Sequence, residues 1–314
     1  MQKDLTDSTQ KAISCIINGL KANPDDPYLN ALLKEFKLIG DGTFGVVNLT
    51  YGDFGPLFMI KSIKRENVTS DMESLVHEAF VGMSAINTLR KEIPHFIHTY
   101  GVIECGGKQG ALLTKRNWCQ RGTPEAVYVA IEPVSAAESL VKVISEDIDL
   151  HHFAKIIIQI ESALSLASDR FGFTHYDLHD SNVLVQEFGN DIYVPIYYDG
   201  TMKYMKTRFL PRIIDYGLSY VQFDKEKFGF VEEGVFRYLR SYPIRDSVTL
   251  LMCCFDDLYR KIRSGKGTDN TDDCIRFIRE IYPATGGEVD EDYPLFGQDV
   301  GAVKTGTNMI GNGE

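Results

Sequence analysis

The sequence lacks an excess of basic residues. It contains 33 lysines and arginines against 44 aspartates and glutamates, which gives a formal net charge of −11. General binders of duplex DNA need a basic surface, and this chain does not have one on average. We therefore expect no nucleic-acid partner. The acidity does not exclude an anionic ligand, but a local site would have to hold it.

The sequence also lacks paired cysteines. Its six cysteines stand at positions 15, 105, 119, 253, 254 and 274, and none forms a C-x-x-C motif. A zinc site of paired thiolates is therefore not indicated. We expect reduced, mostly buried thiols and a cytosol-like compartment.

Long hydrophobic runs are missing as well. No stretch approaches the ~18 apolar residues of a membrane span, and the apolar patch at 12–17 is too short for a secretory signal. This predicts an intracellular protein with no membrane partner. Hydrophobic residues make up 44% and charged residues 25% of the 314 positions, as in globular proteins with one two-lobed domain or two domains.

Hydrophobic periodicity and glycine breaks predict a small sheet with one helix, followed by a mostly helical half that joins it near Glu132-Pro133-Val134. A cleft between two unlike lobes is a common ligand site. The predicted helices cover 5–20, 27–38, 70–91, 149–171, 246–262 and 271–282. The predicted strands lie at 38–39, 46–51, 57–61, 97–104, 126–132 and within 182–221.

A glycine-rich segment separates the first two predicted strands. It reads Gly40-Asp41-Gly42-Thr43-Phe44-Gly45-Val46-Val47. A dinucleotide fingerprint would need a helix after the glycines, whereas a β-branched strand follows here. A flap whose backbone amides cover phosphates and a plain glycine hairpin are equally compatible with this motif alone.

Lys61 ends the next strand, at a distance from the flap that suits a cation for nucleotide phosphates. It would otherwise be a solvated strand residue. A carboxylate partner is needed to orient it. Ser70 and Glu73 form a predicted capping box, so Glu78, beside the apolar face of the same helix, is the better candidate.

Two polar groups follow in the second half of the chain. Asp177 and Asn182 stand five residues apart on a loop before an apolar strand, a pattern that suits a base and a metal ligand. Asp215 ends an apolar strand and is followed by an aromatic residue and a glycine. The four motifs are the glycine-rich segment, Lys61, the Asp177–Asn182 pair and Asp215 with its aromatic residue and glycine. Each alone can be accidental, but all four in this order are not.

Together these motifs resemble the protein-kinase family. The glycine flap, Lys61 with Glu78, the loop His175-x-Asp177-x-x-x-x-Asn182 and Asp215-Tyr216-Gly217 match its signature from about 36 to 260. The stretches 77–82, 87–90 and 93–96 look most like divergent Ser/Thr kinases of large nucleocytoplasmic DNA viruses.

The resemblance implies an α+β, bilobal protein kinase-like fold, with a β-rich N-lobe carrying one main helix and a shortened, mostly helical C-lobe. The expected parts are a helical extension at 1–35, the N-lobe at 36–133, the C-lobe at 134–284 and a flexible acidic, glycine-rich tail at 285–314. A location in the host cytoplasm or virion would follow.

The implied activity is transfer of the γ-phosphoryl of ATP to Ser or Thr hydroxyls of proteins. Asp177 would be the base, with Lys61, Glu78 and His179 assisting. Asn182 and Asp215 would hold Mg²⁺. The expected ATP-binding residues are Gly40, Gly42, Thr43, Phe44, Gly45, Val47, Lys61, Ile131, Glu132, Val134 and Leu184.

Several positions depart from the family pattern. Tyr176 stands where many kinases carry an Arg that pairs with a phosphorylated loop, and His179 replaces a Lys. Residues 186–210 insert an extended hairpin. No A-P-E motif follows Asp215, although Asp246 starts a helix and could bind the catalytic-loop backbone.

Two alternatives stay open. His179 and the short C-lobe favour a small-molecule kinase of the aminoglycoside or choline type, whereas Phe44 and Asp215-Tyr216-Gly217 count against it. A non-catalytic pseudokinase scaffold is the other alternative. Such proteins usually lose a catalytic Asp or Lys, and none is lost here.

Overall fold

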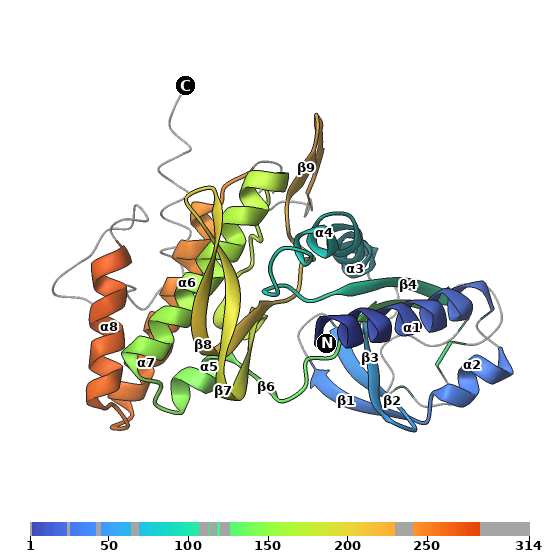
Figure 1. Cartoon of the computed structure of the whole chain (residues 1–314), viewed down its shortest axis with the longest axis horizontal. Coiled ribbons are helices and arrows are strands. Elements are labelled where there is room, and N and C mark those ends of the chain that lie inside the picture. Colours follow the sequence, from blue (N-terminus) through green and yellow to red (C-terminus); the bar gives the residue numbers. More distant parts are fainter. Residues whose placement is uncertain are drawn as a thin grey trace. The chain divides into compact units, whose positions relative to one another are not determined.

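The structure is a computed structural model of the α+β class, compatible with the bilobal kinase-like fold expected from the sequence (Figure 1). It describes residues 2–23, 26–41, 45–63, 69–106, 113, 118–119, 126–229 and 241–282. The chain forms two compact units. Unit 1 comprises 1–135, 166–173 and 214–241, and unit 2 comprises 136–165, 174–213 and 242–314. The four-part division of the chain stays a prediction, and the tail at 285–314 lies outside the described residues.

Unit 1 is built on a five-stranded antiparallel sheet. Its strand order is β1 (Glu35–Asp41), β2 (Gly45–Gly52), β3 (Gly55–Ile63), β5 (Ala126–Ile131) and β4 (Thr99–Cys105). In β2 the buried residues alternate with partly exposed ones, which is the pattern of a strand with one face on the core. Gly55, with φ +123°, allows the tight turn between β2 and β3.

The predicted helix at 27–38 is wrong beyond its first turns. Helix α2 (Pro27–Leu32) is capped by Asp26, whose side chain accepts hydrogen bonds from Tyr28 N and Leu29 N. β1 then begins at Glu35, where it pairs with Tyr51 of β2. Strand pairing with a neighbour distant in sequence therefore overrides the local helical spacing of apolar residues.

The predicted helix at 70–91 is confirmed, with an irregularity in its middle. α3 (Thr69–Val81) continues through a π-helical turn (Gly82–Ile86) into α4 (Asn87–Leu89). A Cβ atom at Gly82 would lie 2.1 Å from Thr99 Oγ1, so only glycine lets the helix approach β4 this closely. The side chain of Ser70, and with it the predicted capping box, lies outside the described residues.

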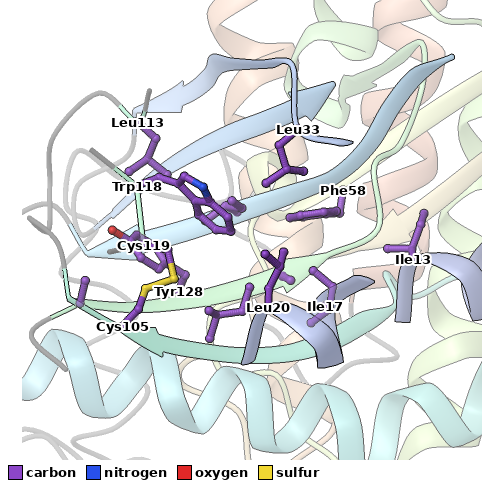
Figure 2. Packing of buried hydrophobic residues seen from close by; sticks show 14 residues of the cluster. Ile13, Ile17, Leu20, Leu33, Phe58, Cys105, Leu113, Trp118, Cys119 and Tyr128 are labelled. Carbon is purple, nitrogen blue, oxygen red and sulfur yellow. A yellow bond between two sulfur atoms is a disulfide. The ribbon is translucent and has the colours of Figure 1, made fainter. Parts of the chain in front are cut away.

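The N-terminal helix is part of the core of unit 1. α1 (Gln2–Ala22) lies along β4 (Figure 1). Its residues Ile13, Ile17 and Leu20 are buried in one cluster with Phe58 and Tyr128, as Figure 2 shows. The segment predicted as an extension therefore supplies one side of the hydrophobic core.

The same cluster contains a disulfide, so the expectation of six reduced thiols is wrong. Cys105, at the end of β4, is bonded to Cys119, with 5.1 Å between their Cα atoms (Figure 2). The adjacent Trp118 is buried against Phe36 and Tyr128. Disulfides are rare in reducing compartments, so the cysteines no longer indicate a cytosol-like compartment. Cys254 and Cys274 are free and buried, as expected.

Unit 2 combines helices with a long hairpin. β7 (Val183–Tyr198) and β8 (Thr201–Ile213) pair antiparallel, which confirms the extended hairpin predicted for 186–210. The hairpin runs beside α6 (Leu150–Phe171) (Figure 1), and Ser162 Oγ of that helix accepts a hydrogen bond of 2.6 Å from Tyr197 N. The other elements of this unit are β6 (Ala137–Ser139), α5 (Leu140–Ser145), a 3-10 turn (Asp180–Asn182), α7 (Ile244–Arg263) and α8 (Asp269–Ile281).

Two short strands, β9 (Val221–Phe223) and β10 (Glu226–Phe228), form a separate hairpin in unit 1. Among the described residues, no helix combines the length and the apolarity that crossing a membrane would require.

Candidate functional site

Lys61 lies between two carboxylates in unit 1. Its Nζ is 2.6 Å from Glu78 Oε2 and 2.8 Å from Asp215 Oδ1. β3 presents the lysine, α3 presents Glu78, and the segment after β8 presents Asp215. Three segments far apart in sequence therefore bring together three residues that the sequence singled out. Glu73, the rejected alternative, takes no part in these two ion pairs.

The charges of this group are set by burial and by each other. Burial lowers the pKa of Lys61, but the carboxylates of Asp215 and Glu78 more than offset this, so the net shift is upward and the ammonium stays charged. Burial raises the pKa of Glu78 to about 7, against the opposing effect of Lys61. The two carboxylates also differ in exposure: the Glu78 side chain is 5% exposed and that of Asp215 is 40% exposed. Asp215 is thus the accessible carboxylate of the group.

The backbone around Asp215 is specialised. Asp215 has φ +67°, a left-handed conformation that costs a non-glycine residue energy. The next residue, Tyr216, is buried beside Phe96 and Phe173, and its hydroxyl accepts a hydrogen bond of 3.1 Å from Ile97 N. Burial raises the pKa of Tyr216, so the phenol stays neutral. The tyrosine in this motif therefore gains a polar anchor that phenylalanine could not provide.

A second group of polar residues forms within unit 2. Asn182 Nδ2 donates to Asp177 O at 2.8 Å and fixes the loop that carries Asp177. Asp177 N donates to His175 Nδ1 at 3.3 Å. His179 Nε2 lies 3.9 Å from Asp177 Oδ2. The structure therefore brings Asp177, His179 and Asn182 together.

Asp246 holds the start of this loop through two hydrogen bonds. It is buried at the start of α7, and its two carboxylate oxygens accept hydrogen bonds from His175 N at 2.6 Å and Tyr176 N at 2.8 Å. The predicted contact of Asp246 with the backbone of this loop is confirmed. Tyr176 has φ +68°, and the Arg245 guanidinium lies 5.5 Å from the centre of its ring.

The residues expected to bind ATP lie on several elements. Gly40, Gly45 and Val47 belong to β1 and β2, where Val47 pairs with Lys61 and Gly40. Ile131 ends β5, and Glu132 and Val134 follow it in unit 1, whereas Leu184 is on β7 in unit 2. The predicted flap residues Gly42, Thr43 and Phe44 lie outside the described residues.

Arg90 is a residue that sequence reasoning passed over. Its guanidinium holds the Glu132 carboxylate, with Nη1 2.5 Å from Oε2 and Nη2 3.2 Å from Oε1, and Nη1 also donates to Phe96 O. Glu132 N donates to His98 O at 2.8 Å, and His98 N donates back to Glu132 Oε2. The segment after β5 is thereby fixed to the start of β4. The sequence shows only that an arginine precedes Ile93-Pro94-His95, and this does not indicate a partner 42 residues away.

Two side chains, one in each unit, carry oxygen atoms of the kind that a hard cation binds. Asp215 in unit 1 has an accessible carboxylate. Asn182 in unit 2 donates its amide nitrogen to Asp177 O and also carries an amide oxygen. Carboxylate and amide oxygens are the ligands that Mg²⁺ prefers in proteins. Among the described residues, no cluster of three or more His, Cys, Asp or Glu side chains suits a metal ion.

Comparisons with known proteins agree with a kinase-like character. No family model matches the chain. It is 31% identical over 107 residues to probable kinase 098L of Invertebrate iridescent virus 3, which covers 33% of this chain and 20% of that protein. It is 23% identical over 222 residues to uncharacterized protein 035R of the same virus, covering 65% of this chain and 19% of that protein. With uncharacterized protein 179R of Invertebrate iridescent virus 6 it shares 28% identity over 176 residues, or 51% and 14% of the two chains.

The chain thus spans a fifth or less of the length of these curated relatives. The distant match to a probable kinase, joined to the α+β fold, suggests a viral kinase-like protein.

Proposed function

We propose that this protein transfers the γ-phosphoryl group of ATP to Ser or Thr hydroxyls of protein substrates, with Mg²⁺ as the metal cofactor. The observation that carries the proposal is the Lys61 ammonium held between Glu78 and Asp215. A fixed, permanently charged lysine beside an accessible carboxylate is suited to a polyphosphate that arrives with a divalent cation.

Each residue has a role in this proposal. Lys61, oriented by Glu78, would neutralise the α- and β-phosphates of ATP. Asn182 and Asp215 would hold Mg²⁺, which supplies positive charge to the phosphate oxygens when bound. Asp177 would orient the acceptor hydroxyl and take its proton. Gly40, Gly45 and Val47, with Ile131, Glu132, Val134 and Leu184, would enclose the nucleotide.

A small-molecule acceptor is the second candidate. His179, which lies 3.9 Å from Asp177, favours it. The sequence Asp177-Leu178-His179 resembles that of kinases of amino sugars and choline, and haspin-like kinases share it as well. In either case His179 would lie near the transferred phosphoryl as a weaker cation than lysine.

One experiment separates the two acceptors. The protein is incubated with Mg-ATP and either casein or a panel of amino sugars and alcohols, with Asp177→Asn as the inactive control. We expect phosphate on protein serine and threonine that depends on Asp177. Phosphate found only on small molecules would reassign the acceptor. No phosphate transfer, together with no shift of the melting temperature by Mg-ATP, would leave a pseudokinase scaffold.

A further inference from the structure

The helix that carries Glu78 is also held from another side. Ser74, His77 and Phe80 of α3 recur every three residues and so line up along one side of the helix. All three contact the segment that follows Asp215, within unit 1. Glu78 points from the same helix to Lys61, so the two contacts are coupled through one rigid element.

Two hydrogen bonds join α3 to the backbone just after Asp215. Ser74 Oγ donates to Gly217 O at 3.2 Å, and His77 Nε2 donates to Ser219 O at 2.7 Å. The approach is close, because a Cβ atom at Gly217 would lie 2.4 Å from Ser74 Oγ. Burial lowers the pKa of His77, so its ring is neutral and its Nε2 proton is committed to the Ser219 carbonyl.

An aromatic cluster extends this contact to the β9–β10 hairpin. The Phe80 ring lies 4.8 Å from that of Phe228 and 6.0 Å from that of Phe223, measured between centroids. Phe223 also contacts Phe228 at 5.8 Å and Phe171, at the end of α6, at 5.5 Å. Offset and edge-to-face rings at these separations attract each other beyond simple burial. The hairpin is therefore clamped between α3 and the end of α6.

We propose that His77, Phe80 and Phe228 are positioning residues: they dock the β9–β10 hairpin on α3 and thereby hold Glu78 against Lys61. The contact uses only uncharged groups, so it needs no phosphate on the 217–228 segment. This inference rests on the proposed phosphotransfer for its kinetic consequences, but the position of α3 can be measured without any catalysis.

Two substitutions test the clamp. Phe228→Ala removes one ring from the hairpin without altering α3, and His77→Ala removes the hydrogen bond to Ser219. His77→Gln keeps a side-chain N–H donor and serves as the conservative rescue. Val76→Ala is the matched control, because Val76 is an exposed residue of the same helix.

The first readout is amide hydrogen exchange of residues 72–81 in the full chain. We expect Phe228→Ala and His77→Ala to speed exchange in α3, and we expect His77→Gln and Val76→Ala to leave it near that of the wild type. Unchanged exchange in Phe228→Ala, in a protein that melts as a folded unit, would overturn the proposal. If Phe228→Ala does not fold, His77→Ala against His77→Gln decides in the same way.

The second readout is kinetic. Phe228→Ala should lower kcat about tenfold, the scale of one or two aromatic contacts. Because Phe228 acts through the position of Glu78, the loss of kcat should shrink to less than about twofold in a Glu78→Gln background. An equal loss in both backgrounds would overturn the link to Glu78. A wild type no more active than Asp177→Asn would refute the proposed function instead, and the exchange experiment would still decide the clamp.

Discussion

At the scale of single residues, buried ionisable side chains hold parts of the backbone in place. Asp246 is the clearest case, because its carboxylate has both oxygens occupied by the backbone N–H groups of His175 and Tyr176. Burial raises its pKa to about 7 despite these two donors, which favour the charged form. Asp246 therefore stabilises the fold of the loop through these two hydrogen bonds.

Asp246→Ala should therefore destabilise the fold. The substitution leaves two buried N–H donors without acceptors, and we expect the free energy of unfolding in urea to fall by about 2–4 kcal/mol. Asp256→Ala on the same helix removes a half-exposed acid paired with Arg260 and should cost less than about 1 kcal/mol. Equal losses for the two variants would contradict the supporting role of Asp246.

His98 gives the pH dependence. Burial lowers its pKa to about 4, Arg90 adds to this shift, and Glu132 opposes it. Below the ordinary value of 6.5 the unfolded chain binds a proton at His98 that the folded protein does not. The stability from the neutral ring is therefore complete above about pH 6.5 and is lost as the pH falls toward 4.

The measurement compares wild type with His98→Gln by urea unfolding between pH 7.5 and 4.5. Titrating carboxylates affect both proteins, so the difference between them isolates His98. We expect the advantage of the wild type to shrink on acidification. An advantage that stays constant across this range would show that His98 titrates normally.

At the scale of elements, α1 is an integral helix of unit 1 rather than an appended one. Ile17 on this helix is fully buried in the cluster that contains Phe58. Ile17→Ala should lower the free energy of unfolding by about 2–4 kcal/mol through lost burial and the cavity left behind. Cys15→Ala, at an exposed position of the same helix, should have almost no effect. A loss under about 1 kcal/mol for Ile17→Ala would mean that α1 is dispensable to the core.

Elements with a strong local pattern could be predicted from the sequence. The long helix α6, the paired helices α7 and α8, and the β7–β8 hairpin all follow from periodicity and turn residues. The start of β1 could not be, because pairing with β2 decides it. The π-helical turn that begins at Gly82 could not be predicted either, because the residue that lies against Gly82 is Thr99 of β4, which is distant in sequence.

Some residues of the candidate site could likewise be predicted from the sequence, and others could not. Lys61, Glu78 and Asp215 could be predicted because each is a charged residue beside an apolar strand or helix face, where a charge is costly unless it is paired. The predicted capping role of Glu73 and the place of Glu78 beside the apolar helix face favour Glu78 as the partner, and the structure places Glu78 against Lys61. Arg90, His77 and Phe228 could not be found, because an arginine, a histidine and a phenylalanine carry no local sign of a partner distant in sequence.

At the scale of the whole molecule, the Cys105–Cys119 disulfide links the end of β4 to a residue 14 positions further along. A crosslink that closes a loop of this length stabilises a protein by roughly 3 kcal/mol, mainly by restricting the unfolded chain. The unfolding of the protein should therefore depend on the redox state of the solution.

Adding dithiothreitol should lower the melting temperature of the wild type but not that of the Cys105→Ser, Cys119→Ser double variant, which should melt at the lower temperature throughout. Alkylation of the denatured, non-reduced protein should label four thiols and leave two protected. Six labelled thiols in protein purified from its native source would show that the bond does not form there.

The proposed phosphotransfer is measured by following labelled γ-phosphoryl from Mg-ATP to casein with wild type, Asp177→Asn, Lys61→Met and Val76→Ala. We predict transfer by the wild type and by Val76→Ala, and a loss of at least about 100-fold for Asp177→Asn and for Lys61→Met. Equal transfer by wild type and Asp177→Asn, in proteins of the same melting temperature, would contradict the assignment of this chain as an active phosphotransferase.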